Sequence, residues 1–169
     1  QPRSRGLGDV YKRQDVIIGG REAQYVLLAD EFKKFCKNVY IATDDGSLGT
    51  KGFVTNVLSD LIEKGESFDE VIAIGPVPMM KAVVNVTKPK NIKTSVSLNP
   101  IMIDGTGMCG CCRVSVDGKI KFACVDGPDF DGLQVDFDEL MLRQRMFKEE
   151  EHTVSENANR MCNLMGGVK

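Results

Sequence analysis

Short apolar runs alternate with amphipathic stretches in the first part of the chain. The apolar runs are DVIIGG (15–20), VYIAT (39–43), EVIAIG (70–75) and KTSVSL (93–98). Continuous apolar runs of this length are typical of strands that are buried on both faces of a parallel sheet. Four such runs with helical stretches between them predict a parallel α/β sheet with right-handed crossovers.

The stretches between these runs have apolar residues at helical spacing. Residues 22–35 carry apolar side chains with charges between them, and residues 53–65 carry a single apolar stripe that ends at Gly65. Glycine suits the position that follows a helix. In the third predicted helix, over 78–87, Pro78 can occupy the first position, where its missing N–H costs nothing.

Glycines and polar residues follow the predicted strands. Backbone N–H groups and helix N-termini point at a ligand along this edge of an open α/β sheet, and glycine lets the backbone approach a phosphate closely. The pattern therefore indicates a nucleotide site. Ordinary turns are the alternative, and the TDDG sequence could form only an Asx-type turn. The residues in question are 19–21, 43–47, 75–76 and 99–100.

Composition bounds the class of protein. The chain has 169 residues, of which 42% are hydrophobic and 27% charged, so it can bury a core without disulfides. We find neither an apolar run of about 18 residues nor a secretory signal, which favours a cytoplasmic protein without a membrane span. The basic residues are scattered, which argues against a nucleic-acid partner. In a reducing compartment, clustered cysteines are typical of metal sites.

The beginning of the chain has a different character. Residues 1–14 have no periodicity, carry four basic side chains and run directly into the first apolar run. We interpret them as adaptor-derived sequence, with a disordered native tail as the alternative. A G-x-G-x-x-G turn, which normally opens a dinucleotide fold, does not occur after Asp15. We therefore expect the native protein to begin upstream, and the sheet of this chain to lack a central strand and to have an exposed edge.

A β-hairpin is predicted in the segment RVSVDGKIKFA, because Asp117-Gly118 joins two alternating strands. A two-residue loop returns Cys124 to the neighbourhood of Cys111 and Cys112. The strand pairs predicted from this loop are Val116 with Lys119 and Arg113 with Phe122.

Four potential metal ligands surround this hairpin, with the spacing Asp104-x4-Cys109-x2-Cys112-x11-Cys124. Plant-type [2Fe–2S] ferredoxins have C-x4-C-x2-C followed by a distant cysteine. In this chain a carboxylate, a harder but competent ligand for ferric iron, takes the first position. A zinc site would normally add a second C-x2-C knuckle or histidines, and a redox C-x-x-C would begin a helix. The sequence thus predicts a [2Fe–2S] cluster, with zinc and structural or redox thiols as alternatives.

Two arguments conflict over which cysteine of the CGCC sequence binds iron. An ideal hairpin pairs Cys124 with Cys111, whereas the ferredoxin spacing selects Cys112. Register is least reliable at the first residue of a strand, and a tight loop readily breaks the last rung. We therefore predict that Cys112 is a ligand and that Cys111 lies close to the cluster without binding it.

Four segments resemble one known family. They are TDDGSLGTKGFVT, AIGPVPMMKAV, SLNPIMIDGTGMCGCCRV and KFACVDGPDFDGLQVDFDELMLRQR. They are similar to the FAD/NAD-binding, [2Fe–2S] electron-transfer subunits of the sulfide dehydrogenase, NADH-dependent ferredoxin:NADP oxidoreductase and dihydroorotate dehydrogenase group. The resemblance covers about residues 15–150. Asp104 with three cysteines resembles the ferredoxin:NADP oxidoreductase branch, because members of the dihydroorotate branch carry four cysteines.

The resemblance implies a ferredoxin-reductase-like architecture. After the lead (1–14), it implies an NAD(P)-binding α/β domain that lacks its first strand (15–100), a β-hairpin cluster domain (101–135) and a C-terminal helix with its tail (136–169). It further implies FAD, held mostly by a β-barrel domain that this chain lacks, so we expect the chain alone to hold no FAD and to be inactive. The implied partner is a larger flavin and iron–sulfur oxidoreductase subunit.

The resemblance also places a nicotinamide dinucleotide across the strand ends. Met79 and Met80 could instead face the core, and Arg21 could be exposed without a ligand. The candidate dinucleotide contacts are Gly20, Arg21, Thr43, Asp44, Asp45, Gly46, Gly75, Pro76, Met79 and Met80.

Overall fold

The computed structural model describes residues 14–164, with side chains as far as residue 158. The lead predicted for residues 1–14 therefore lies outside the described residues, apart from Gln14. The chain divides into two compact units, residues 1–69 and 70–169, which are taken one at a time.

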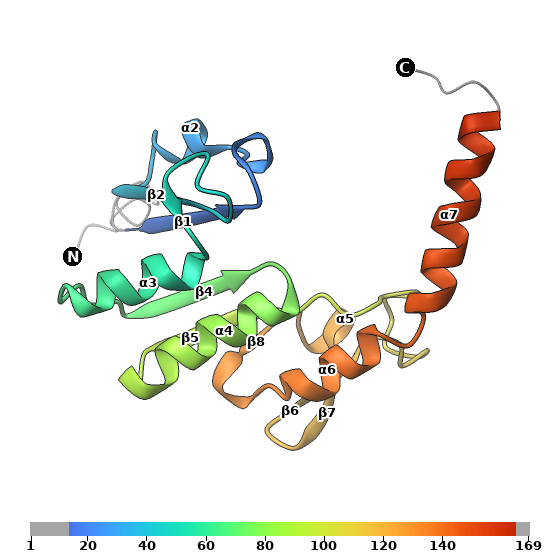
Figure 1. Cartoon of the computed structure of the whole chain (residues 1–169). Helices are drawn as coiled ribbons and strands as arrows, with labels where there is room; N and C mark the ends of the chain where they lie inside the picture. The colour runs from blue at the N-terminus through green and yellow to red at the C-terminus, as the bar shows by residue number, and fades with distance from the viewer. Residues whose placement is uncertain (1–13, 165–169) are drawn as a thin grey trace. The chain divides into compact units, whose positions relative to one another are not determined.

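The first unit is a three-stranded parallel sheet with one helix against it (Figure 1). Its strands are β1 (Asp15–Gly20), β2 (Asn38–Thr43) and β3 (Thr50–Lys51), hydrogen-bonded in that order. Helix α3 (Val54–Glu63) buries its apolar stripe against Ala42 of β2. Gly65 follows this helix with φ +90°, as predicted, and Glu66 N–H donates to the carbonyl of Leu61 to complete a Schellman motif.

The helix predicted over 22–35 is wrong. The structure has a short 3-10 turn, η1 (Ala23–Tyr25), and a single helical turn, α2 (Ala29–Phe32). Neither piece has a side-chain cap, and Leu28 between them takes a left-handed conformation with φ +59°. The N–H of Ala23 donates to Ser47 Oγ at 2.8 Å. This contact with a residue distant in the sequence holds the segment in a conformation other than the helix that the spacing of its apolar residues predicts.

The second unit is built around β4 (Glu70–Ile74) and β5 (Lys93–Ser97), which are parallel. Helix α4 (Val77–Thr87) covers one face of this pair, with Met80 and Val84 in the core, and η2 (Lys88–Lys90) follows it (Figure 1). Pro76 is the N-cap of α4, so Pro78 lies at the second helical position rather than the predicted first.

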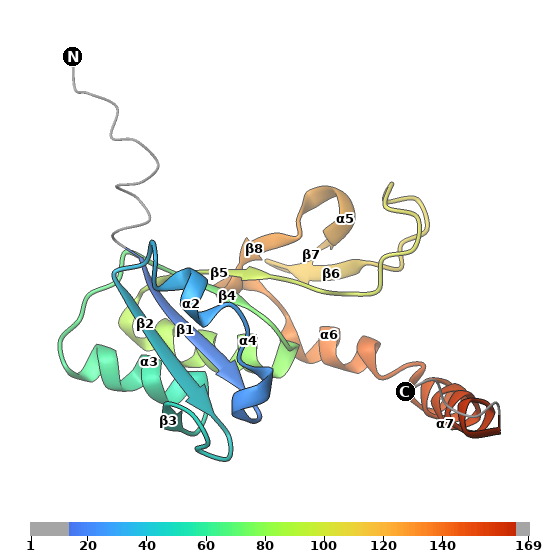
Figure 2. The same ribbon diagram turned by 90° about the horizontal axis from the view of Figure 1, so that it is seen from above.

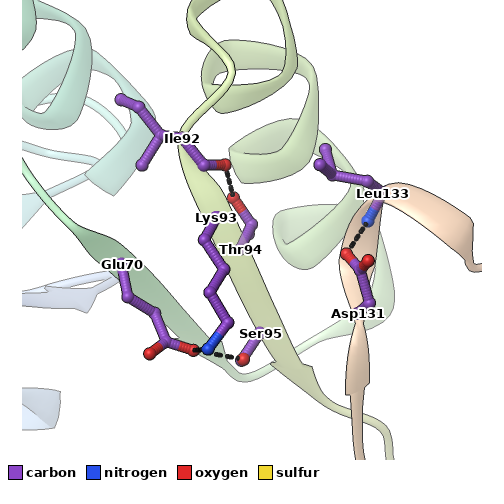
Figure 3. A network of polar contacts seen from close by, with 7 residues as sticks. All are labelled: Glu70, Ile92, Lys93, Thr94, Ser95, Asp131 and Leu133. Atoms are coloured by element: carbon purple, nitrogen blue, oxygen red, sulfur yellow. Dashed lines mark hydrogen bonds and ion pairs between the residues drawn. The ribbon is translucent and has the colours of Figure 1, made fainter.

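Polar contacts join the strands of the second unit (Figure 3). The Glu70 carboxylate accepts a hydrogen bond from Ser95 Oγ at 2.6 Å and lies 3.2 Å from Lys93 Nζ. Asp131 accepts the N–H of Leu133 at 3.0 Å and so caps η3 (Gly132–Gln134). The Glu70 contacts thus link β4 to β5, and the Asp131 contact shapes the end of β8.

The predicted single sheet of four parallel strands needs correction. The four predicted strands lie in two sheets, β1 with β2 in one and β4 with β5 in the other. Each sheet gains a third strand that was not predicted, β3 in the first and β8 (Asp129–Asp131) in the second. Strand β8 runs antiparallel to β5. Periodicity identifies strands but not their neighbours, and a three-residue strand with two exposed carboxylates has no apolar run to reveal it.

The rest of the second unit contains the hairpin β6 (Arg113–Val116) and β7 (Lys119–Phe122), followed by α5 (Ala123–Asp126), α6 (Phe137–Gln144) and α7 (Lys148–Leu164). The strand pairs are those that the two-residue loop predicts. Asp117 and Gly118 have φ of +52° and +67°, as a type I′ turn requires. Among residues 14–164, no helix combines the length and the hydropathy needed to cross a membrane.

Candidate metal centre

The segment with the predicted ligands begins and ends at neighbouring strands. Ser97 of β5 pairs with Asp129 of β8, and Leu98 N–H donates to the carbonyl of Pro128 at 3.0 Å. The chain between these points forms an irregular loop, then the hairpin and α5 (Figure 2). The sheet therefore fixes the two ends of this whole segment side by side, although the first part of the segment has little regular structure.

Asp104 organises the first part of this loop. Its Oδ1 accepts hydrogen bonds from the N–H and the hydroxyl of Thr106, and its Oδ2 accepts the N–H of Cys109 at 2.9 Å. These donors lower the pKa of the Asp104 carboxyl, the Thr106 N–H most of all. Gly105 and Gly107 have φ of +77° and +82°, which lets the chain turn tightly around the carboxylate.

Cys112 and Cys124 lie together, with 3.1 Å between their Sγ atoms. The β6–β7 ladder ends at the pair Arg113–Phe122, after which Ala123 N–H donates to the carbonyl of Cys112 and the chain turns into α5. This turn brings Cys124 to Cys112. The Cys112 thiol is 1% exposed, and its pKa is lowered chiefly by the N–H of Cys124.

Cys109 and Cys111 form a second contact between thiols. Their hydrogen bond is the main reason why the pKa of Cys111 is raised. Cys109 is exposed and Cys111 half-buried. The four predicted ligands thus lie in two pairs, Asp104 with Cys109 and Cys112 with Cys124, and Cys111 lies beside the first pair.

Paired donors suit a centre with two metal ions. Among the residues that the structure describes, no three His, Cys, Asp or Glu side chains converge as they would to hold one metal ion. A structural zinc ion takes four donors around one point, whereas a [2Fe–2S] cluster takes two protein donors at each iron. Three sulfurs and one carboxylate oxygen are also donors that ferric iron accepts. The residues therefore fit a two-iron cluster better than a single zinc ion.

The strand ends of the first unit bring four predicted dinucleotide contacts together. Asp44 N–H donates to Gly20 O at 3.1 Å, and Asp45 N–H donates to Arg21 O at 3.3 Å. The Asp45 carboxylate accepts the N–H and hydroxyl of Ser47 at 3.0 and 2.7 Å, so the Asx-type turn is present.

Thr43 and Gly46 shape this loop from within. The Thr43 side chain is 0% exposed, and its hydroxyl donates to the carbonyl of Leu48 and accepts the Leu48 N–H. Gly46 has φ +80°, and its N–H donates to the carbonyl of Thr43. Thr43 therefore holds the loop closed, and its hydroxyl is already satisfied within the protein.

The remaining candidates lie at the start of α4 in the second unit. A Cβ on Gly75 would lie 2.5 Å from Met79 Cε, so Met79 covers this glycine closely. Pro76 is exposed, whereas Met80 is 0% exposed and packs in the core. The alternative that Met80 faces the core is thus the arrangement found, and it leaves Met80 no exposed surface for a dinucleotide.

Two residues near the predicted ligands were missed from the sequence. Thr106 could have been found, because a hydroxyl residue two positions after an aspartate is the pattern of an Asx-type turn. Arg143 donates from Nη2 to the carbonyl of Cys111 at 3.3 Å across 32 residues, and no local pattern predicts that contact.

Comparison with known proteins gives matches to one group. Residues 99–136 match the family model for the iron–sulfur cluster binding domain of dihydroorotate dehydrogenase B. The chain is 51% identical over 138 residues to an uncharacterized protein in the adh 3'region of Clostridium beijerinckii, covering 81% of this chain and 47% of that protein. It is 45% identical over 150 residues to a homologue of the dihydroorotate dehydrogenase B (NAD(+)) electron transfer subunit in Thermotoga maritima. That match covers 89% of this chain and 52% of the homologue.

A solved structure agrees with these matches. It is that of an NADH-dependent reduced ferredoxin-NADP oxidoreductase, studied for flavin-based electron bifurcation, and it matches with a TM-score of 0.75 and 44% identity. The match covers 85% of this chain and 51% of that one, so the chain spans about half the length of its relatives. Over the part that it covers, the chain is therefore similar to a homologue of the dihydroorotate dehydrogenase B electron transfer subunit and to NADH-dependent reduced ferredoxin-NADP oxidoreductase, and residues 99–136 match an iron–sulfur cluster binding domain.

Proposed function

We propose that this protein is an electron-transfer subunit that moves electrons between NAD(P)H, FAD and a [2Fe–2S] cluster and passes them to a larger partner oxidoreductase subunit. The favoured type is ferredoxin:NADP oxidoreductase or sulfide dehydrogenase. The observation that carries the proposal is the arrangement of the four predicted ligands in two pairs, three of them from a glycine-rich loop and Cys124 from α5. When bound, the cluster supplies one-electron transfer, while the protein sets its position and potential.

In this proposal each pair of donors holds one iron. Asp104 and Cys109 would bind the first iron, and Cys112 and Cys124 the second. The N–H of Cys124 stabilises the thiolate of Cys112, so the proton leaves that thiol more readily than from an ordinary cysteine. The β5–β8 pairing holds the loop in place on the second unit.

The dinucleotide part of the proposal involves the strand ends. In the first unit the proposed contacts are Gly20, Arg21, Asp44 and Asp45, with Gly46 shaping the loop. In the second unit, taken by itself, they are Gly75, Pro76 and Met79. The cytoplasmic location and the domain limits at residues 100 and 135 belong to the proposal too. Free thiols at five described cysteines are consistent with a reducing compartment.

A dihydroorotate dehydrogenase electron-transfer subunit is the second candidate. It is supported by the family model over residues 99–136 and by the names of relatives such as that of Thermotoga maritima. Asp104 in the first ligand position favours the ferredoxin:NADP type. A zinc-binding interaction module is a further candidate, for which the paired donors offer no single tetrahedral site.

The decisive experiment is anaerobic reconstitution of the 169-residue chain with iron and sulfide. We expect about two iron and two sulfide per chain with visible absorption, because this is the composition of a [2Fe–2S] centre. A matched control is Cys36→Ser, which removes a half-buried thiol from the first unit and should leave the iron content unchanged. A colourless protein that takes up one zinc ion and no sulfide would support the zinc module and refute the proposal.

A further inference from the structure

Helix α6 is firmly attached to the second unit. Asp136 caps it by accepting the N–H of Glu139 at 2.9 Å, and Asp138 forms an ion pair with Lys81 of α4 at 2.6 Å. Phe137 and Leu140 bury the inner side of the helix. A side chain near the C-terminal end of α6 therefore has a defined place relative to the sheet.

Arg143 extends from this helix to the cluster loop. Its Nη2 donates to the carbonyl of Cys111 at 3.3 Å, and the side chain is half-buried in a pocket that Ile101, Ile103 and Phe147 also line. Within residues 14–158, no carboxylate lies within ion-pair distance of Arg143. A guanidinium in a partly apolar pocket without a carboxylate partner interacts strongly with any other negative charge nearby.

The contact leads directly to a predicted ligand. The carbonyl of Cys111 belongs to the same peptide group as the N–H of Cys112. A cationic donor on the carbonyl polarises the peptide, strengthens its N–H as a hydrogen-bond donor, and brings a positive charge close to the predicted ligands.

The sign of the effect on a bound cluster follows from charge. Three thiolates and one carboxylate outweigh the positive charge of a [2Fe–2S] core, and reduction adds another negative charge. A nearby positive charge and a stronger N–H donor both stabilise the more negative, reduced form.

We infer that Arg143 is a positioning residue that acts through the Cys111–Cys112 peptide to raise the midpoint potential of the cluster. This inference rests on the proposed function. It adds a role for a side chain of α6, outside the loop that supplies the ligands.

The test is a redox titration of the reconstituted chain, followed by visible and electron-paramagnetic spectra. Arg143→Met should keep the iron and sulfide content and lower the midpoint potential. Arg143→Lys should lower it less, because lysine keeps the charge but not the guanidinium geometry. The matched control is Arg145→Met, which removes an exposed cation from the end of the same helix and should leave the potential unchanged.

Each outcome decides the matter. Equal potentials for wild type and Arg143→Met, or an equal shift in Arg145→Met, would overturn the inference. If Arg143→Met fails to hold a cluster, Arg143→Gln replaces it, because its amide still donates without a charge; a wild-type potential in that variant overturns the inference and a lowered one supports it. A wild-type chain that holds no cluster would instead refute the proposed function, and this inference with it.

Discussion

Two loops of the molecule share one local motif and differ in what surrounds it. In the loop after β2, Asp45 accepts the N–H and hydroxyl of Ser47. In the loop after β5, Asp104 accepts the same two groups from Thr106. The first loop returns to the sheet as β3, whereas in the second Asp104 also binds the N–H of Cys109, next to the clustered thiols.

The comparison shows what local chemistry can and cannot reveal. The pKa of both carboxyls is lowered, and in both the largest cause is the backbone N–H two residues further on. A lowered pKa therefore does not distinguish an aspartate that closes a turn from one that is predicted to bind iron. The neighbouring sulfurs make the distinction.

The largest contrast is expected in stability. A Cβ on Gly49, which has φ +71°, would lie 2.2 Å from the carbonyl oxygen of Ile41, whereas a Cβ on Gly105, with φ +77°, meets nothing within 4 Å. Gly49→Ala should lower the free energy of unfolding by at least about 3 kcal/mol, and Gly105→Ala by roughly 1–2 kcal/mol. Urea denaturation of the chain without metal measures both. Equal losses would show that the loop after β2 is no more tightly built than the cluster loop.

The next contrast concerns the two aspartates as ligands. Asp104→Cys should retain a cluster but change its visible spectrum and lower its midpoint potential, because a thiolate donates more charge to iron than a carboxylate. Asp45→Cys is the control, since it changes the matching position of the other loop. A spectrum and potential unchanged in Asp104→Cys would remove Asp104 from the ligand set.

Dinucleotide binding should depend on the aspartates of the loop after β2, whereas the cluster should depend on Asp104. Asp45→Ala or Asp44→Ala should change the affinity for NAD(P)H, because both residues lie beside Gly20 and Arg21 at the strand ends. The measurement is a chemical-shift titration of the isotope-labelled chain with NADH and NADPH. Asp30→Ala, in the exposed turn α2, is the control. Unaltered affinity for NAD(P)H in both variants would refute a role of Asp44 and Asp45 in dinucleotide binding.

The smallest expected effect is on the titration of Asp45. The N–H and the hydroxyl of Ser47 lower the pKa of the Asp45 carboxyl below its ordinary value, so its contribution to stability is present above the ordinary value and is lost as the pH falls through the folded value. Ser47→Ala removes the hydroxyl donor and keeps the N–H, so the pKa of Asp45 should rise part of the way to the ordinary value of an aspartate. Carboxyl NMR follows this directly, with Thr106→Ala in the other loop as control. If the pKa of Asp45 does not change in Ser47→Ala, the backbone N–H of Ser47 rather than its hydroxyl lowers that pKa.

The sequence predicted the elements with strong local signals. The runs over 15–20, 39–43, 70–75 and 93–98 all contain strands, the helix before Gly65 is present, and the Asp117-Gly118 turn set the register of the hairpin. The resemblance to iron–sulfur electron-transfer subunits is confirmed by the family model and by the relatives.

Long-range pairing could not be predicted in the same way. Strand β8 is short and acidic, and only its pairing with β5 makes it a strand. The approach of Cys124 to Cys112 depends on the break in the ladder after Phe122, and the contact from Arg143 depends on how α6 packs. The spacing of the cysteines gave Cys112 as the predicted ligand, where the ideal register alone would have given Cys111.

The central claim is that the cluster is held by Asp104, Cys109, Cys112 and Cys124. The most direct measurement compares the electron-paramagnetic spectra of the reduced, reconstituted Cys111→Ser and Cys112→Ser chains. We predict that Cys111→Ser keeps the [2Fe–2S] spectrum, and that Cys112→Ser loses or strongly shifts it, as Cys109→Ser and Cys124→Ser should. A bleached Cys111→Ser protein beside an unchanged Cys112→Ser protein would contradict the account.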